Sequence, residues 1–245
     1  MLLVPWDNQM PVAEVAANVL LMLLCYGYIL LMILVSSRMP QWLRVSQKVS
    51  RKFLHAMIGN LPFIIPFFTA SIYPALVAAP FIVVTFVASP VSPFKDVGRK
   101  LKGLADMTEE GHHLGLVFYA ISYTVLAFLF GSRPYVIAAG ILPMAYGDST
   151  ASLGGERLGR TKYKIFAGKS LEGSVTMFLV SFASFTLSLV FFSLLYSFSL
   201  AERIVPSLAV ALVTTLAEAL SPMGADNLAV PAVGALTFLL LTGGI

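Results

Sequence analysis

Long apolar segments dominate this 245-residue chain and limit what it can fold into. A helix that crosses a bilayer needs about 20 mostly apolar residues. Eight segments meet that requirement, at roughly 13–36, 53–71, 73–92, 114–131, 134–152, 174–198, 204–221 and 228–244. Only 11% of the residues are charged, whereas soluble domains carry about 25%. The sequence therefore predicts an all-α, polytopic transmembrane helical bundle that forms a single integral membrane domain over residues 1–245.

The number of spans is open at two joins. The break between the second and third segments, near Tyr73 and Pro74, is short, and so is the break at residues 222–227 between the last two. Seven spans with one re-entrant segment is therefore the alternative to eight.

The basic residues favour eight spans with the N-terminus outside. In that topology 14 of the 16 Lys and Arg lie in cytoplasmic loops, and only Arg133 and Arg203 lie outside. The positive-inside rule predicts such an excess in cytoplasmic loops. Membrane orientation and anionic headgroups or phosphates thus explain the net charge of +4, and no nucleic-acid partner is expected.

This topology also brings polar residues from six parts of the chain to the cytoplasmic ends of their helices. Charged groups at membrane depth are costly, and they usually face a cavity or one another. The convergence predicts a functional site on the cytoplasmic side.

The first of these parts is RKFLH, which opens the second segment at residues 51–55. Arg51, His55 and Gly59 are four residues apart and share one helix face. Arg51 and Lys52 therefore suit phosphate oxygens at the cytoplasmic rim. The alternative is a basic stop signal followed by an interfacial histidine.

The approach to the fourth segment, DMTEEGHHLG at residues 106–115, combines carboxylates with histidines. Glu110, His112 and His113 are candidates for a metal ligand or a proton acceptor. Adjacent histidines diverge by about 100° on a helix, so they cannot form an H-x-x-x-H metal pair. A solvated loop before the helix is the alternative.

Residues 147–159 read GDSTASLGGERLG and place Asp148 at the cytoplasmic end of the fifth segment, with Ser152 one turn later. Mg²⁺ is typically held by one or two carboxylates together with nucleotide oxygens. Asp148 is therefore a metal candidate, and Arg157 is a phosphate-binding candidate. The alternative is an aspartate that caps a helix beside a glycine turn.

GKSLEG, at residues 168–173, looks like the end of a P-loop, but Tyr163 stands where that motif requires glycine. Gly168, Lys169 and Ser170 still offer backbone N–H groups, an ammonium and a hydroxyl, which suit an anion at a helix N-terminus. Glu172 follows in the same turn. A plain basic loop is the alternative.

Three further polar residues complete the set: Glu218 near the end of the seventh segment, and Asp226 with Asn227 at the start of the eighth. Several carboxylates and cations on one rim indicate a cation-bridged polyphosphate. A transport site would more often lie at the midplane of the membrane.

In these motifs, taken in their order along the chain, the sequence resembles the CTP-dependent membrane lipid kinase family. That family includes dolichol kinase, phytol and farnesol kinases and CTP-using diacylglycerol kinase. The resemblance implies a multi-pass membrane enzyme that transfers the γ-phosphate of CTP to the hydroxyl of a lipid alcohol and releases CDP. An isoprenoid alcohol, such as geranylgeraniol, phytol, farnesol or dolichol, is the expected acceptor, and diacylglycerol is the alternative.

Phosphoryl transfer needs cations and Mg²⁺ to neutralise the triphosphate and a group that orients the attacking hydroxyl. The expected metal ligands are Asp148, Asp226 and Asn227; the expected phosphate-binding residues are Arg51, Lys52, Arg157, Gly168, Lys169 and Ser170; the expected catalytic residues are His55, Asp148 and Glu218.

Two functions of other kinds stay open at the level of the sequence. A phosphatidate cytidylyltransferase also combines many spans, CTP, Mg²⁺ and acidic motifs, although the chain lacks the dense D-R-x-D cluster of that class. A non-enzymatic lipid carrier or small transporter is the third interpretation. The sequence predicts no particular oligomeric state.

Overall fold

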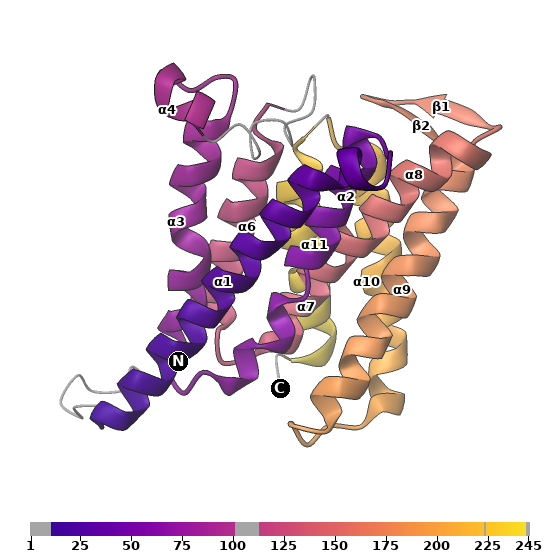
Figure 1. Cartoon of the computed structure of the whole chain (residues 1–245). Coiled ribbons are helices and arrows are strands. Elements are labelled where there is room, and N and C mark those ends of the chain that lie inside the picture. Colours follow the sequence, from indigo (N-terminus) through magenta and orange to yellow (C-terminus); the bar gives the residue numbers. More distant parts are fainter. Residues whose placement is uncertain (1–10, 101–112, 223, 244–245) are drawn as a thin grey trace.

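Packed helices make up nearly all of the structure, a computed structural model that describes residues 11–100, 113–222 and 224–243. Most of them stand side by side, and α1 crosses the others obliquely (Figure 1). The helices are α1 (Val12–Trp42), α2 (Gln47–Ile58), α3 (Ile72–Ala88), α4 (Lys95–Lys100), α6 (Gly115–Phe130), α7 (Pro134–Leu142), α8 (Ser149–Leu158), α9 (Leu171–Ser193), α10 (Leu200–Leu220) and α11 (Asp226–Thr242). The predicted all-α class is confirmed.

Several helices have the composition of membrane helices. Within the described residues, α1, α9 and α10 are long and apolar enough to cross a membrane, and α3, α6 and α11 are shorter apolar helices. Large apolar side chains such as Leu30, Leu187 and Leu240 are exposed on the outside, as expected for a surface that a bilayer covers. The structure thus agrees with a membrane-embedded bundle, while the eight spans and the outside N-terminus stay predictions.

The expected span 53–71 is not a single helix. α2 ends within it and is followed by two 3-10 turns, Leu61–Phe63 and Ile65–Phe67. Pro62 and Pro66 have no N–H to donate, so they interrupt an α-helical hydrogen-bond ladder. This part of the chain therefore enters the bundle as a short helix, and RKFLH lies on it.

The centre of the bundle is a continuous helical stretch made of α7, the π-helical segment η3 (Pro143–Asp148) and α8. All nine residues of α7 are buried. The π-helical segment begins at Pro143, which cannot donate a backbone hydrogen bond. Such wide turns are rare and occur frequently at functional sites. This one ends at the buried Asp148, where η3 packs against α2 and α9.

Close backbone contact holds this central stretch against α11. A Cβ atom at Gly140 would collide with the backbone oxygen of Pro231, and a Cβ atom at Gly234 would collide with that of Ala139. Only glycine at these two positions permits the observed approach of α7 and α11.

A two-stranded antiparallel hairpin joins α8 to α9, where the sequence predicted a loop. β1 (Lys162–Lys164) pairs with β2 (Gly168–Ser170), with Tyr163 opposite Lys169. Because side chains alternate along a strand, Tyr163 points inward, and its hydroxyl lies 2.6 Å from Oγ of Ser174.

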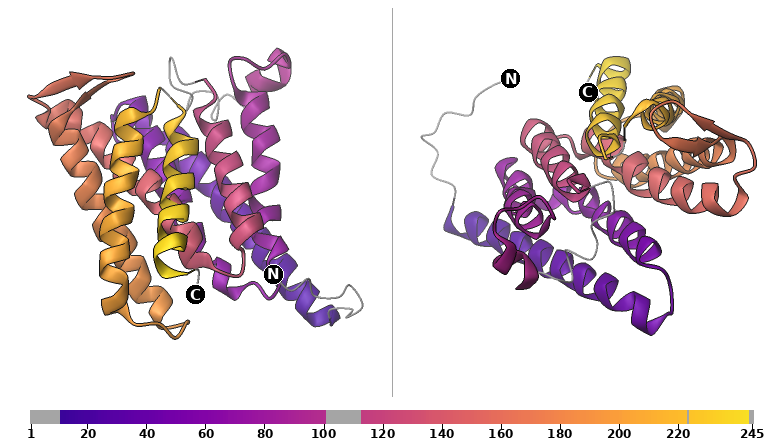
Figure 2. Two further views of the ribbon diagram at one scale, coloured as in Figure 1. Left: turned by 180° about the vertical axis from the view of Figure 1, so that it is seen from behind. Right: turned by 90° about the horizontal axis from the view of Figure 1, so that it is seen from above.

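Most polar elements gather at one end of the bundle. The hairpin, the start of α2 and α4 lie at the upper end in Figure 1, whereas α1 begins and α11 ends toward the lower end. The view from behind in Figure 2 shows the same arrangement, with the turn between α10 and α11 also at the upper end. The basic segments that the sequence assigned to the cytoplasm therefore share one end of the molecule.

Candidate active site

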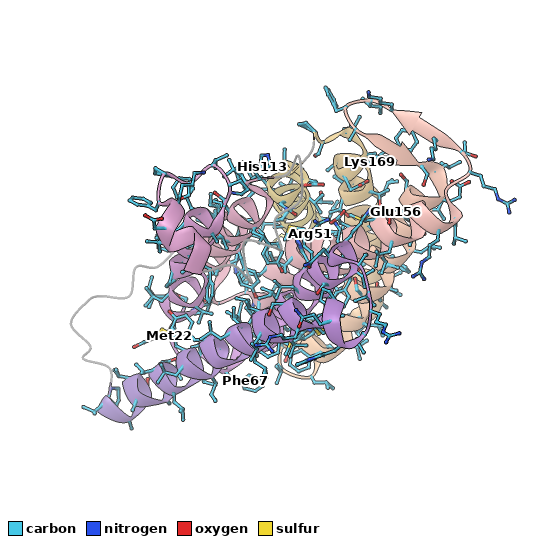
Figure 3. All side chains as sticks on the ribbon, turned by 45° about the horizontal axis from the view of Figure 1, so that its top comes forward. Met22, Arg51, Phe67, His113, Glu156 and Lys169 are labelled. Carbon is cyan, nitrogen blue, oxygen red and sulfur yellow. The ribbon has the colours of Figure 1, made fainter. Side chains whose placement is uncertain are left out.

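A cavity of about 510 Å³ lies at the end of the bundle that carries the hairpin. Nine helices and strands of the described residues contribute to its wall, and Figure 3 labels three of the residues, Arg51 of α2, Glu156 of α8 and Lys169 of β2, at this end of the bundle. The lining residues are Lys48, Arg51, Lys52, His55, Gly115, Leu116, Asp148, Ala151, Ser152, Gly155, Glu156, Lys162, Ala167, Gly168, Lys169, Ser170, Gly173, Ser174, Glu218, Ser221, Asp226 and Asn227. The predicted convergence of separate polar motifs is thus present in the structure.

Lys52 of α2 and Asp148 of η3 form an ion pair deep in this cavity. The ammonium nitrogen lies 2.6 Å from Oδ2 of Asp148, and the side chains are only 11% and 10% exposed. The hydroxyl of Ser149 donates to the backbone oxygen of Lys52 at 3.3 Å. Because an unpaired buried charge is costly, each partner makes the burial of the other tolerable.

Lys169 of β2 and Glu218 of α10 form a second ion pair in the cavity. The ammonium of Lys169 also donates to the backbone oxygen of Glu218 at 2.6 Å. This contact joins the hairpin to the C-terminal end of α10. The carboxylates of Asp148 and Asp226 are close enough to Glu218 to act on its charge, so three acidic groups lie near one another in the cavity.

Three charged residues line the cavity without having been assigned a role from the sequence: Lys48, Glu156 and Lys162. Lys48 forms an ion pair with Glu156, which connects α2 to α8 near the surface. Helical spacing could have identified Lys48 from the sequence. Lys48, Lys52 and His55 follow one another at intervals of four and three residues and therefore share a face of α2.

Ser170 is the N-cap of α9, as its place before the helix suggested. Its Oγ accepts the N–H of Gly173 at 3.1 Å. A Cβ atom at Gly155 or Gly159 would press against that hydroxyl. These glycines therefore allow the end of α8 to pack against the cap of α9, and Gly155 also lines the cavity.

Asn227 connects α11 to α6. Its amide nitrogen donates to the backbone oxygen of Gly115 at 3.0 Å, and its own backbone oxygen accepts the hydroxyl of Ser122 at 2.6 Å. The preceding Asp226 uses Oδ1 to accept the N–H of Asn227 at 2.9 Å. Since the amide nitrogen is committed to α6, only the amide oxygen of Asn227 could contribute to a metal site.

His55 lies at the inner end of the cavity and is only 6% exposed. Its ring packs edge-on against Tyr119, with 4.2 Å between the ring centroids, and the hydroxyl of Tyr119 donates to the backbone oxygen of His55 at 3.2 Å. Within the described residues, Nε2 of His55 is buried and has no hydrogen-bond partner. Burial, together with the charges of Lys52 and Arg51, lowers the pKa of His55 to about 3. The neutral imidazole can therefore accept a hydrogen bond from a hydroxyl that enters the cavity.

Some predicted site residues lie elsewhere. Arg157 and His113 are exposed and do not line the cavity. Glu172 does not line it either, and its carboxylate accepts the backbone N–H just before β1, at 3.1 Å. Glu110 and His112 lie outside the described residues.

The cavity contains donors that suit a divalent cation. Asp148, Asp226 and Asn227 all line it, and hard cations prefer carboxylate and amide oxygens. Within the described residues no cluster of three His, Cys, Asp or Glu could hold a metal. Two carboxylates are enough where polyphosphate oxygens supply the other ligands, so these residues fit a Mg²⁺ ion that binds together with a nucleotide.

Comparison with known proteins gives one informative match. A phytol kinase from Synechocystis sp. is 35% identical over 193 residues, and the alignment covers 75% of this chain and 75% of that protein. No family model matches the chain, and no solved structure matches it. The extent and identity of the match show that the chain belongs to the polyprenol and phytol kinase family.

Proposed function

We propose that this protein is a lipid kinase that transfers the γ-phosphoryl group of CTP to the hydroxyl of a membrane isoprenoid alcohol, with Mg²⁺ as cofactor. The single observation that carries the proposal is the cavity in which five cations and four carboxylates meet at one end of an apolar bundle. A triphosphate needs such a concentration of positive charge. The relative named phytol kinase agrees with a lipid alcohol as acceptor.

Two lysines from different elements, Lys52 of α2 and Lys169 of β2, supply positive charge for the triphosphate. Lys52 and Lys169 each hold a carboxylate in the structure, and a flexible ammonium can turn from a carboxylate to a phosphate oxygen without leaving the cavity. Arg51 and Lys48 add charge from the same helix. Binding of a triphosphate would thus exchange contacts within the cavity rather than desolvate new lysines.

Asp148 and Asp226 are the residues that would hold Mg²⁺. When bound there, Mg²⁺ would supply positive charge that offsets the charge developing during transfer. Once Lys52 turns to the phosphates, the carboxylate of Asp148 becomes available on the inner wall.

His55 and Glu218 are the two candidates for the base. In the reaction the acceptor oxygen forms a bond to the γ-phosphorus, and the bond between that phosphorus and the β–γ bridging oxygen breaks. The hydroxyl proton passes to the base, and CDP leaves with the bridging oxygen. The buried Nε2 of His55, which has no hydrogen-bond partner within the described residues, favours the histidine as the group that receives the hydroxyl. The carboxylate of Glu218 becomes available only when Lys169 turns to a phosphate.

The site faces the cytoplasm in this proposal. The elements that carry the basic segments lie at the same end as the cavity (Figure 1), and positive charge is concentrated in cytoplasmic loops. CTP would then enter from the compartment where nucleotides are present, while the acceptor arrives from the bilayer.

One panel of assays tests the proposal. Purified protein in lipid vesicles is given CTP or ATP together with farnesol, geranylgeraniol, phytol, a dolichol or diacylglycerol. The proposal expects a lipid monophosphate and CDP with at least one isoprenoid alcohol. Release of pyrophosphate with CMP retained on the lipid would instead identify a cytidylyltransferase, and no turnover with any acceptor would favour a carrier.

A further inference from the structure

A narrow apolar slot adjoins the polar cavity and shares two lining residues with it. The slot has a volume of about 60 Å³ and is walled by α1, α2, α3, α6 and the turn after α2. His55 and Leu116 line both the slot and the large cavity. The two spaces therefore meet at the buried imidazole.

The slot runs along the helices and away from the polar end. On α6 its wall extends from Leu116 to Tyr123, and on α3 from Thr85 to Ala78. Seven residues at 1.5 Å each give a length of about 10 Å. The small volume leaves room for only the first few carbons of one hydrocarbon chain and excludes two chains side by side.

The walls of the slot suit hydrocarbon. The hydroxyl of Thr85 donates to the backbone oxygen of Phe81 at 2.6 Å, and that of Tyr119 donates to the backbone oxygen of His55 at 3.2 Å. The hydroxyl of Tyr123, which also lines the slot, is buried and has no hydrogen-bond partner within the described residues. Ile33, Ile58 and Phe81 are only partly buried, so the slot is not sealed from the outside of the bundle. A lipid chain could therefore enter sideways from the bilayer.

We propose that this slot binds the part of the acceptor's hydrocarbon chain next to the hydroxyl, and so places that hydroxyl beside Nε2 of His55. Ala78 and Ala120, which are both 6% exposed, keep the slot open on its two long walls. Tyr119 acts as a positioning residue, because it packs against the imidazole and bonds to the backbone of His55. The inference rests on the proposed kinase function and adds to it a preference for single-chain alcohols over diacylglycerol.

Photolabelling tests the slot without relying on turnover. The probe is a single-chain fatty alcohol with a diazirine partway along its chain, added to the full-length protein in vesicles. Labelled peptides are expected to map to the faces of α3 and α6 that include Ala78 and Ala120. Ala78→Leu and Ala120→Leu should each reduce labelling about tenfold, because lost contact with a few methylenes has that effect.

The matched control is Ala79→Leu, which adds the same side chain at the next position of α3, where the residue is partly buried and does not line the slot. Labelling in this variant should equal that of the original protein. Ala120→Val, with a smaller added volume, should give an intermediate reduction and guards against misfolding of the leucine variants. Labelling that maps to α9 or α10, or labelling that is unchanged by Ala78→Leu and Ala120→Leu, would overturn the proposal.

Kinetics then connect the slot to catalysis. The KM for the isoprenoid alcohol should rise about tenfold in the two leucine variants, with the KM for CTP unchanged. Tyr119→Phe should lower kcat more than it raises the KM for the alcohol. The substitution removes the hydrogen bond to the backbone of His55, whereas the phenyl ring still lines the slot. A protein that labels in the slot but transfers no phosphoryl group would contradict the kinase proposal alone, whereas turnover with labelling elsewhere would contradict only the slot.

Discussion

The ammonium of Lys52 lies 2.6 Å from the carboxylate of Asp148, although the two residues are 96 positions apart in the chain. One belongs to the short helix α2 and the other ends the π-helical segment at the centre of the bundle. The pair therefore connects two of the separate motifs that the sequence suggested would meet. The residues that are proposed to bind phosphate and metal therefore also contribute to the packing of the site.

Removal of either partner of this pair is expected to destabilise the protein. Lys52→Met leaves a buried carboxylate, and Asp148→Asn leaves a buried ammonium, at a cost of about 3–5 kcal/mol each. The double variant should lose less than the sum, because neither charge is then unpaired. Thermal unfolding in detergent measures all three, and strictly additive losses would show that the pair is not coupled.

The exposed ion pair between Lys48 and Glu156 offers the control. Glu156 is 59% exposed, so Glu156→Gln should change stability by less than about 1 kcal/mol. A loss as large as that of Asp148→Asn would mean that burial is not the reason for the effect.

Lys169→Met is expected to weaken CTP binding. A hydrogen bond from a charged donor contributes about 1.5–3 kcal/mol, so the KM for CTP should rise about 10- to 100-fold. Lys164→Met is the matched control, because Lys164 lies on the neighbouring strand and does not line the cavity. Equal effects of the two substitutions on the KM would assign the loss to general surface charge.

Activity is expected to require a divalent cation and to depend on Asp226. A chelator should abolish transfer, and added Mg²⁺ should restore it. Asp226→Asn should increase the Mg²⁺ concentration needed for half-maximal rate, since one of two carboxylate ligands is lost. Transfer at the full rate in excess chelator, or an unchanged Mg²⁺ dependence in Asp226→Asn, would remove the metal assignment.

Orientation can be tested with single cysteines. Cys25, the one cysteine of the chain, is buried and is replaced by alanine in the background. Lys164→Cys should react with a membrane-impermeant thiol reagent only when the reagent reaches the cytoplasmic face, and Arg133→Cys should react only from outside. The reverse pattern would invert the proposed topology.

The polar end of the bundle could be predicted well because its signal is chemical. Charged residues in an apolar chain have few places to lie, and the structure brings Arg51, Asp148, Lys169, Glu218 and Asp226 to one cavity. The same reasoning also placed Arg157 in the site, but its side chain at the end of α8 is exposed and does not line the cavity. Hydropathy alone does not say which face of a helix a charge will occupy.

Features that depend on packing could not be predicted. Hydropathy joined residues 53–71 into one span, whereas Pro62 and Pro66 divide the segment into turns. The slot beside His55 is invisible in the sequence, because its walls combine alanines and larger residues from helices distant in the chain. Which small residue leaves a gap, and which is filled by a neighbour, is decided only when the helices are packed.

The central claim is most directly tested with CTP labelled either at the γ-phosphate or at the α-phosphate, given with geranylgeraniol or phytol in vesicles. A lipid kinase transfers the γ-label to the lipid and leaves the α-label in CDP. Asp148→Asn, purified in a folded state, should reduce transfer of the γ-label at least about 100-fold. Recovery of the α-label on the lipid, or near-normal transfer by Asp148→Asn, would contradict the account.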